Sequence, residues 1–229
     1  NVAELSGSGA TVGKAWTDAI NMGVEEINAA GGVLGEMLEV TTYDSQTDAQ
    51  TSRALVQKAI DDGAFLILGT VYSSSTIVNM LVTQQQGIPQ IVGSEAPAIT
   101  QKGNPYIFRS SFGAQKSMPK IAAYIADGLK AKSVAVSWVN NEFGKGGHDA
   151  FVSEMEKRGI TVAADVSSEV GQADFAADVA KLKGSGAEAI FAYLHEEESA
   201  RLLRELRKQG SSIDPCDARK RTARMGCRQ

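Results

Sequence analysis

The chain has 229 residues, of which 43% are hydrophobic, 22% charged and 6% aromatic, with 23 glycines and five prolines. This composition is that of a globular protein and excludes the disordered, collagen-like and disulfide-scaffold classes. No apolar run reaches the roughly 18 residues of a membrane span. A formal net charge of −4 argues against a nucleic-acid-binding surface.

Short β-rich runs alternate with longer amphipathic runs through the first 210 residues. Strands are predicted over residues 2–5, 38–43, 65–68, 89–92, 106–109, 133–138, 160–166 and 189–193. Helices are predicted over residues 13–30, 48–61, 75–86, 117–129, 145–157, 175–183 and 197–208. The run 65–68 is apolar throughout, as expected of a strand buried on both faces of a parallel sheet. The alternation predicts an α/β protein with two doubly wound parallel-sheet lobes and an incomplete C-terminal part.

The strand–helix rhythm restarts after residue 109, which predicts a first lobe over residues 1–112 and a second over 113–210. Residues 211–229 lack helical or strand periodicity and contain both cysteines, Cys216 and Cys227. This tail carries five basic residues against two acidic ones. Two interpretations are open: a sequence translated out of frame, or a genuine basic C-terminal extension.

A glycine-rich turn, Gly-Ser-Gly-Ala-Thr-Val-Gly at residues 7–13, lies between the first strand and the first helix. Such a turn can cradle a pyrophosphate, which would indicate a Rossmann-type oxidoreductase. Its last glycine comes one residue late for that motif, and Asp44 lies about 31 residues further on rather than about 20. A turn that lines another kind of cleft fits this spacing better.

Two further motifs lie at neighbouring strand ends. Tyr72 is followed by four hydroxyl residues, of which Ser73 and Ser74 are the first, where a single N-cap needs one hydroxyl. Spare hydroxyls and amides at a helix start suit a small carboxylate. The second motif begins at Gly93 and continues with Ser94 and Glu95. Neighbouring strand ends of a doubly wound sheet open into the ligand crevice, so both motifs are expected to line it.

The sequence offers few arrangements of residues that are typical of catalysis. The two histidines, His148 and His195, have no Cys or Asp at metal-ligand spacing, and no G-x-S-x-G elbow occurs. The carboxylates of residues 196–198 are explained by the favourable helix dipole in a first turn. We therefore predict no catalytic residue, no metal site and no cofactor.

Five segments together resemble one known family. They are Leu-Ser-Gly at 5–7 with Gly13, Val-Glu-Glu-Ile-Asn-Ala-Ala-Gly-Gly-Val at 24–33, Leu-Glu-Val at 38–40 leading to Asp44, Ser-Ser-Ser-Thr at 73–76, and Asn-Pro-Tyr-Ile-Phe-Arg at 104–109. The family is the periplasmic solute-binding proteins of branched-chain amino acid ABC transporters, with the type I binding fold. The resemblance covers about residues 1–210.

The resemblance implies a non-enzymatic clamp. Two lobes joined by three crossovers close over an amino acid or a related small molecule and deliver it to an ABC permease. It also implies a monomer, located in the periplasm or lipid-anchored outside the cytoplasm, with no signal peptide expected within these residues. A ligand-sensing receptor domain of the same fold is the main alternative, ahead of the Rossmann-type oxidoreductase.

The resemblance also implies site residues. Ser73 and residues 93–95 match the positions that hold the ligand carboxylate, and Phe143, before Gly144, matches the aromatic residue that closes from the second lobe. Val12 matches a pocket residue of the first lobe, and His195 and Glu196 match a strand end that faces the cleft. Other interpretations stay open: lobe packing for Phe143, an N-cap for Ser73 and solvated surface for Glu95.

Glu95 departs from the family pattern, which often has threonine there. A carboxylate repels another carboxylate and cannot donate a hydrogen bond unless protonated. Glu95 therefore either pairs with an ammonium or amide of the ligand or points away. A branched-chain amino acid is the leading ligand, with an amide, a polar amino acid or a small cationic compound as alternatives.

The resemblance implies about 120 more residues after Gly210, which supply two crossovers and complete the first lobe. We therefore expect residues 1–229 alone to be unstable and to bind ligand weakly or not at all. A cooperative melt with tight binding would contradict this and would indicate a native tail.

Overall fold

The computed structural model describes residues 1–210, which fall into two compact units: residues 1–113, called the first lobe, and a second lobe that begins at Ala114. Both are α/β, and every strand pair in their sheets is parallel. The predicted fold class is thereby confirmed. The predictions for residues 211–229 lie outside the described residues.

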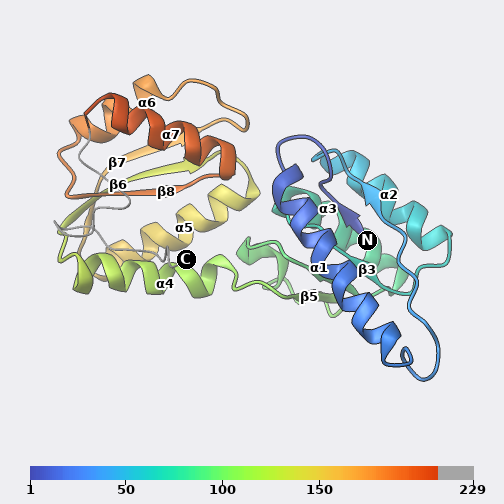
Figure 1. Ribbon diagram of the computed structural model, residues 1–229. Coiled ribbons are helices and arrows are strands. Elements are labelled where there is room, and N and C mark those ends of the chain that lie inside the picture. Colours follow the sequence, from blue (N-terminus) through green and yellow to red (C-terminus); the bar gives the residue numbers. More distant parts are fainter. Residues whose placement is uncertain (211–229) are drawn as a thin grey trace. The chain divides into compact units, whose positions relative to one another are not determined.

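Five short strands and three helices build the first lobe (Figure 1). The strands are β1 (Val2–Ala3), β2 (Tyr43–Asp44), β3 (Ile67–Leu68), β4 (Gln90–Val92) and β5 (Ile107–Arg109). The helices are α1 (Ala10–Ala29), α2 (Ala49–Asp61), α3 (Ser73–Gln86) and the 3-10 turn η1 (Pro97–Ile99). β1 pairs with β2, and β3, β4 and β5 form a second sheet in that order. Val2 and Ile67 share one apolar cluster with Val56 of α2, so the core continues across both sheets.

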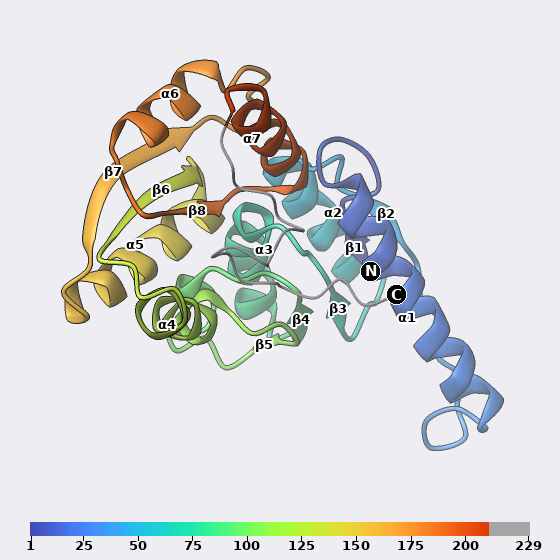
Figure 2. The same cartoon turned by 60° about the vertical axis from the view of Figure 1, so that its left-hand side comes forward.

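The second lobe is a three-stranded sheet with helices on both faces (Figures 1 and 2). Its strands are β6 (Ser133–Val139), β7 (Thr161–Ser168) and β8 (Ala189–Tyr193), in the order β7-β6-β8. Its helices are α4 (Ala114–Ala123), the π-helical turn η2 (Tyr124–Gly128), α5 (Glu142–Lys157), α6 (Ala176–Gly184) and α7 (Glu196–Lys208).

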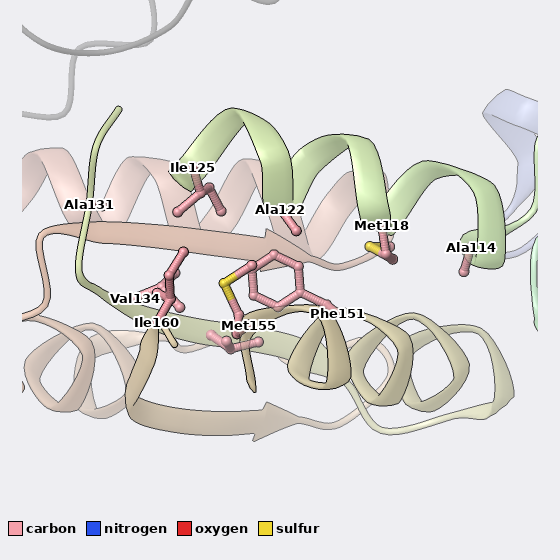
Figure 3. Close-up of a cluster of buried hydrophobic side chains, with 10 residues drawn as sticks. Ala114, Met118, Ala122, Ile125, Ala131, Val134, Phe151, Met155 and Ile160 are labelled. Carbon is pink, nitrogen blue, oxygen red and sulfur yellow. The ribbon is translucent and has the colours of Figure 1, made fainter. Parts of the chain in front are cut away.

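Residues of the central strand β6 alternate between two cores, as the period of two in a strand requires. Val134 and Val136 face the cluster of α4 and α5, whereas Ala135 faces the cluster of α6 and α7. Figure 3 shows Phe151 and Met155 of α5 pointing toward the alanine and methionine side chains of α4. This two-sided packing is the doubly wound arrangement that the sequence predicts.

Two element predictions for the first lobe are wrong in detail. Residues 38–42 form no strand, because β1 pairs with β2 in a register that begins at Val2 opposite Tyr43. Phe65 is 72% exposed, because β3 begins only at Ile67 and Phe65 lies before the buried part of the run. In the second lobe, the predicted helix over 117–129 begins earlier, at Ala114, and becomes π-helical at Tyr124.

Candidate ligand-binding site

Buried hydroxyls join the carboxyl ends of β3 and β4 in the first lobe. Ser73, in the first turn of α3, accepts a hydrogen bond at its Oγ from the N–H of Ala96, at 3.2 Å. Ser94 donates to the carbonyl of Thr70 at 2.8 Å, and its hydroxyl also contacts that of Thr76. The two predicted serines therefore lie at one sheet edge, where their hydroxyls bind parts of the lobe itself.

Glu4, which the sequence analysis did not select, lies fully buried just after β1. Its carboxylate accepts the N–H of Tyr72 at 3.1 Å and the N–H of Val71 at 3.3 Å, the two residues before α3. Burial raises the pKa of the Glu4 carboxyl, although its backbone hydrogen bonds oppose this shift. The sequence signal that could have identified Glu4 was an acidic residue inside the strand predicted over residues 2–5.

Side chains at and just after the end of β2 bind one amide of the glycine-rich turn and two amides of the residues before it. Asp44 accepts the N–H groups of Leu5 at 3.0 Å and Ser6 at 3.1 Å, and Thr47 Oγ1 accepts the N–H of Gly9 at 3.1 Å. Burial opposes ionisation of Asp44, but the hydrogen bonds that it accepts outweigh this and hold the pKa of its carboxyl below its usual value. The Gly9 amide of the turn is therefore already used by Thr47, and it is not open to a pyrophosphate.

Close backbone approach explains two glycines of this turn. A Cβ on Gly13 would lie 2.0 Å from the carbonyl oxygen of Glu4, so glycine lets α1 pack against the end of β1. A Cβ on Gly9 would lie 2.8 Å from the ring of Tyr72. The turn, Glu4 and Tyr72 therefore form one packed unit at the edge of the first lobe.

The remaining first-lobe candidates lie nearby on their elements. Val12 and Ser74 are half-buried in the first turns of α1 and α3. Gly93 ends β4 under the ring of Trp16, since a Cβ there would lie 3.2 Å from that ring. Arg109 binds the backbone carbonyl of Glu95 through Nη1 at 3.2 Å, which fixes the course of the segment after β4.

In the second lobe, three rings stack at the carboxyl edge of the sheet. Phe143 lies between Tyr193, at a centroid distance of 4.2 Å, and His195, at 4.9 Å. Phe143 and His195 were predicted as site residues from the sequence, whereas Tyr193 was not. Stacked aromatic pairs contribute about 0.5–1.5 kcal/mol each beyond the area that they bury. The stack therefore holds Phe143 in place at this edge.

Asn141 fixes the protonation of His195. Its Oδ1 accepts the N–H of Gly144 at 2.9 Å and caps α5, so its Nδ2 donates to His195 Nε2 at 2.8 Å. The imidazole proton is thereby assigned to Nδ1. Burial lowers the pKa of His195, against the opposing carboxylates of Glu198 and Glu196. The neutral ring is the form that this lobe stabilises.

The three glutamates at the start of α7 differ from one another. Glu196 and Glu197 are exposed, and Glu197 pairs with Arg201 at 2.8 Å, in keeping with the helix-dipole interpretation. Glu198 is 1% exposed and accepts the N–H of Gly171 at 2.6 Å. Glu198 therefore holds the loop after β7, a role that the dipole alone did not predict.

Neither metal ligation nor membrane crossing is supported within the part of the chain that the structure describes. Across residues 1–210, no three His, Cys, Asp or Glu side chains gather as metal ligands. Among the helices of the same residues, none has the length and apolar character that crossing a bilayer requires.

Two α/β lobes with polar and aromatic side chains at the carboxyl ends of parallel strands define the class of two-lobed, type I ligand-binding proteins. A sequence profile described as "periplasmic binding protein" matches residues 1–214. The chain belongs to the periplasmic binding protein family.

Curated relatives carry amino-acid-binding names. The leucine-, isoleucine-, valine-, threonine- and alanine-binding protein of Pseudomonas aeruginosa is 33% identical over 82% of this chain and 51% of its own length. The Leu/Ile/Val-binding protein of Escherichia coli is 27% identical over 91% of this chain and 57% of its own. The chain thus spans about half the length of the curated relatives it matches.

Solved structures agree with the fold. LivJ from Streptococcus pneumoniae, in complex with isoleucine, matches 92% of this chain and 60% of its own at a TM-score of 0.85 and 26% identity. A solute-binding protein from R. palustris, in complex with 4-hydroxybenzoate, matches 91% of this chain and 57% of its own at a TM-score of 0.82 and 26% identity.

Proposed function

We propose that this chain is the ligand-capturing part of an extracytoplasmic solute-binding protein that takes an amino acid or related small molecule and delivers it to an ABC permease. It acts as a monomer and catalyses no reaction. The observation that carries the proposal is that polar or aromatic side chains cluster at the carboxyl ends of the parallel strands in each lobe. The names of the relatives, which refer to amino acids, support it.

Each edge contributes a different kind of contact. In the first lobe, Ser73 and the segment from Gly93 to Glu95 supply polar groups, with Val12, Tyr72, Ser74 and Ser94 around them. In the second lobe, Phe143 offers an apolar ring held by Tyr193 and His195, with Glu196 exposed beside them. Closure over the ligand removes water from its charged ends, so fixed polar partners are needed there. The Ser73 hydroxyl, which accepts the N–H of Ala96 and keeps its own O–H to donate, is such a partner.

Calorimetric titration of the 229-residue chain tests this proposal. The ligand panel consists of leucine, isoleucine, valine, threonine, alanine and 4-hydroxybenzoate. The protein concentration is chosen high enough to detect millimolar dissociation constants. We expect at least one to bind, and we expect Phe143→Ala to weaken that binding at least tenfold. Phe65→Ala is the matched control, because Phe65 is an exposed ring placed before β3. Equal losses of affinity in Phe143→Ala and Phe65→Ala would contradict the proposal.

A further inference from the structure

A groove of about 360 Å³ lies in the first lobe beside the start of β1, and none of the proposed site residues lines it. One wall is the segment 38–41, and another is the segment 64–68. Val24 of α1 and Ala59 of α2 line it as well. The groove therefore runs between two stretches of main chain that lead into β2 and β3.

Both walls offer backbone groups without a strand partner. The N–H groups of Ile67 and Gly69 donate toward β4. Because backbone direction alternates along a strand, Leu66 turns its N–H to the opposite side, where the groove lies. Across residues 1–210, this N–H donates to no carbonyl, and neither does the N–H of Thr41 in the other wall. Each wall is therefore a free edge for one more strand.

β1 lies between the two walls and begins at the groove. The N–H of Tyr43 donates to the carbonyl of Asn1 at 2.9 Å, and the terminal ammonium of Asn1 donates to the carbonyl of Thr41 at 2.8 Å. On the other side, a Cβ on Gly69 would lie 2.1 Å from the carbonyl oxygen of Val2. The terminal nitrogen therefore takes the place of a backbone amide in a parallel ladder.

A charged amine suits this place poorly. Asn1 is only 9% exposed, and burial lowers the pKa of its terminal amine. None of the ion pairs in the described part of the chain includes this amine. A neutral backbone N–H at the same position donates the same hydrogen bond without the cost of burying a charge. The groove therefore favours a peptide bond at this nitrogen.

Side chains of β1 alternate between the helices on its two faces. The side-chain oxygen of Asn1 accepts a hydrogen bond from Trp16 of α1 at 3.2 Å, whereas Val2 packs in the apolar cluster that includes Ala59 of α2. Continued with a period of two, a residue before Asn1 would face Ala59, and the residue before that would face Val24. Apolar side chains fit both positions.

We propose that this groove is a strand-accepting slot, in which a short extended segment joined to the nitrogen of Asn1 runs parallel to residues 38–41 and continues β1. Its backbone pairs with both walls, and its apolar side chains fill the space between α1 and α2. The walls thereby gain the pairing partner that a strand needs. Filling the slot extends β2 and β3 toward the bounds predicted from the sequence, 38–43 and 65–68.

Two extended forms of the 229-residue chain test the slot. One carries Lys-Val-Ile directly before Asn1, and the matched control carries Lys-Ser-Gly, which has the same length and charge. Hydrogen exchange is measured by NMR at the N–H groups of Thr41 and Leu66. We expect exchange of both to be about tenfold slower in the Lys-Val-Ile form than in the control, with a higher thermal midpoint. Neither form has a free amine at Asn1, so the terminal charge does not cause the difference.

Val24→Lys, made in the Lys-Val-Ile form, tests the side-chain fit. A lysine at this position places a charge in the groove, so exchange at Thr41 and Leu66 should return to the rate of the Lys-Ser-Gly form. Glu25→Lys is the matched control, because Glu25 is exposed on the same helix and does not line the groove. It should keep the slow exchange.

Three outcomes would overturn the proposal. The first is equal exchange in the two extended forms, and the second is slow exchange that survives Val24→Lys. The third is obtained with the free peptide acetyl-Lys-Val-Ile-amide, added to the 229-residue chain at an equimolar concentration. If it slows the same amides as strongly as the extension does, the slot takes a strand from another chain instead of continuing β1. Ligand capture at the carboxyl ends of the strands is untouched by all three, so the two proposals fail separately.

Discussion

Gly147 controls the position of Tyr193, and its replacement gives the sharpest stability prediction. A Cβ at Gly147 would lie 2.0 Å from Tyr193 Cε1 and 2.4 Å from Cδ1, far inside van der Waals contact. Gly147→Ala therefore forces the Tyr193 ring away from α5. The ring stack of Phe143 on Tyr193, at 4.2 Å, is lost or shifted with it.

The expected cost follows from three contributions. Overpacking of a filled site costs about 1–3 kcal/mol. The displaced ring pair loses about 0.5–1.5 kcal/mol. Alanine in the interior of a helix returns about 1 kcal/mol relative to glycine. The free energy of unfolding of the second lobe should therefore fall by about 0.5–3.5 kcal/mol.

Denaturant unfolding followed by the fluorescence of Trp138, in β6 of the same lobe, measures this change. Gly23→Ala is the control, because Gly23 lies inside α1 with no atom within 4 Å of a new Cβ. The Gly23→Ala replacement should stabilise the first lobe by about 0.5–1 kcal/mol, measured by the fluorescence of Trp16 in α1. A Gly147→Ala chain as stable as the parent would refute the packing that places Tyr193.

Three further predictions concern hydrogen-bonded polar side chains. Because burial lowers the pKa of His195 in the fold, the stability given by its neutral ring is complete above the unfolded value of about 6.5 and is lost as the pH falls from there through the lower folded pKa. His195→Gln should flatten this part of the unfolding profile, and an unchanged slope would contradict the prediction. Ser73→Ala leaves the N–H of Ala96 without its acceptor and should cost about 1–3 kcal/mol in denaturant unfolding; a loss below about 0.5 kcal/mol would argue against that bond. Asp44→Asn should destabilise the first lobe at pH 7 and much less near pH 3, since the lowered pKa of Asp44 gives stability that is lost as the pH falls through its folded value; an equal loss at both pH values would count against it.

Strand-end motifs were the part of the site most open to sequence reasoning. Parallel strands present their carboxyl ends at one edge, so the motifs at Ser73 and Ser94 were expected to meet, and their hydroxyls join adjacent strand ends. Sequence could not show that these hydroxyls bind the lobe itself. That depends on which backbone groups the loops leave without partners.

Glu4 and Tyr193 escaped prediction for different physical reasons. An acid beside a short strand is normally solvated, and only the fold brings the amides of Val71 and Tyr72 to Glu4 across 67 and 68 residues of chain. Tyr193 alternates in a strand like any half-buried residue, and its stacking depends on the space that Gly147 leaves on α5. Both are tertiary effects that no local pattern contains.

The ends of a helix were predictable from the sequence where a capping residue lies next to them. Asp48 precedes α2 and accepts the N–H of Thr51, and Gly87 ends α3 in a left-handed conformation, close to the predicted limits of 48–61 and 75–86. Residues 38–42 lacked such a local determinant. Strand formation there depends on a pairing partner, which no local pattern specifies.

A chemical-shift map of the 229-residue chain, with and without the tightest-binding member of the amino-acid panel, tests solute capture most directly. We predict perturbed amides at the strand ends of both lobes, at residues 71–73 and 93–95 in the first and at 141–143 and 193–196 in the second. Ligand capture by these two edges would be contradicted by shifts confined to one lobe, or by shifts centred away from these strand ends, for example on Phe65 before β3.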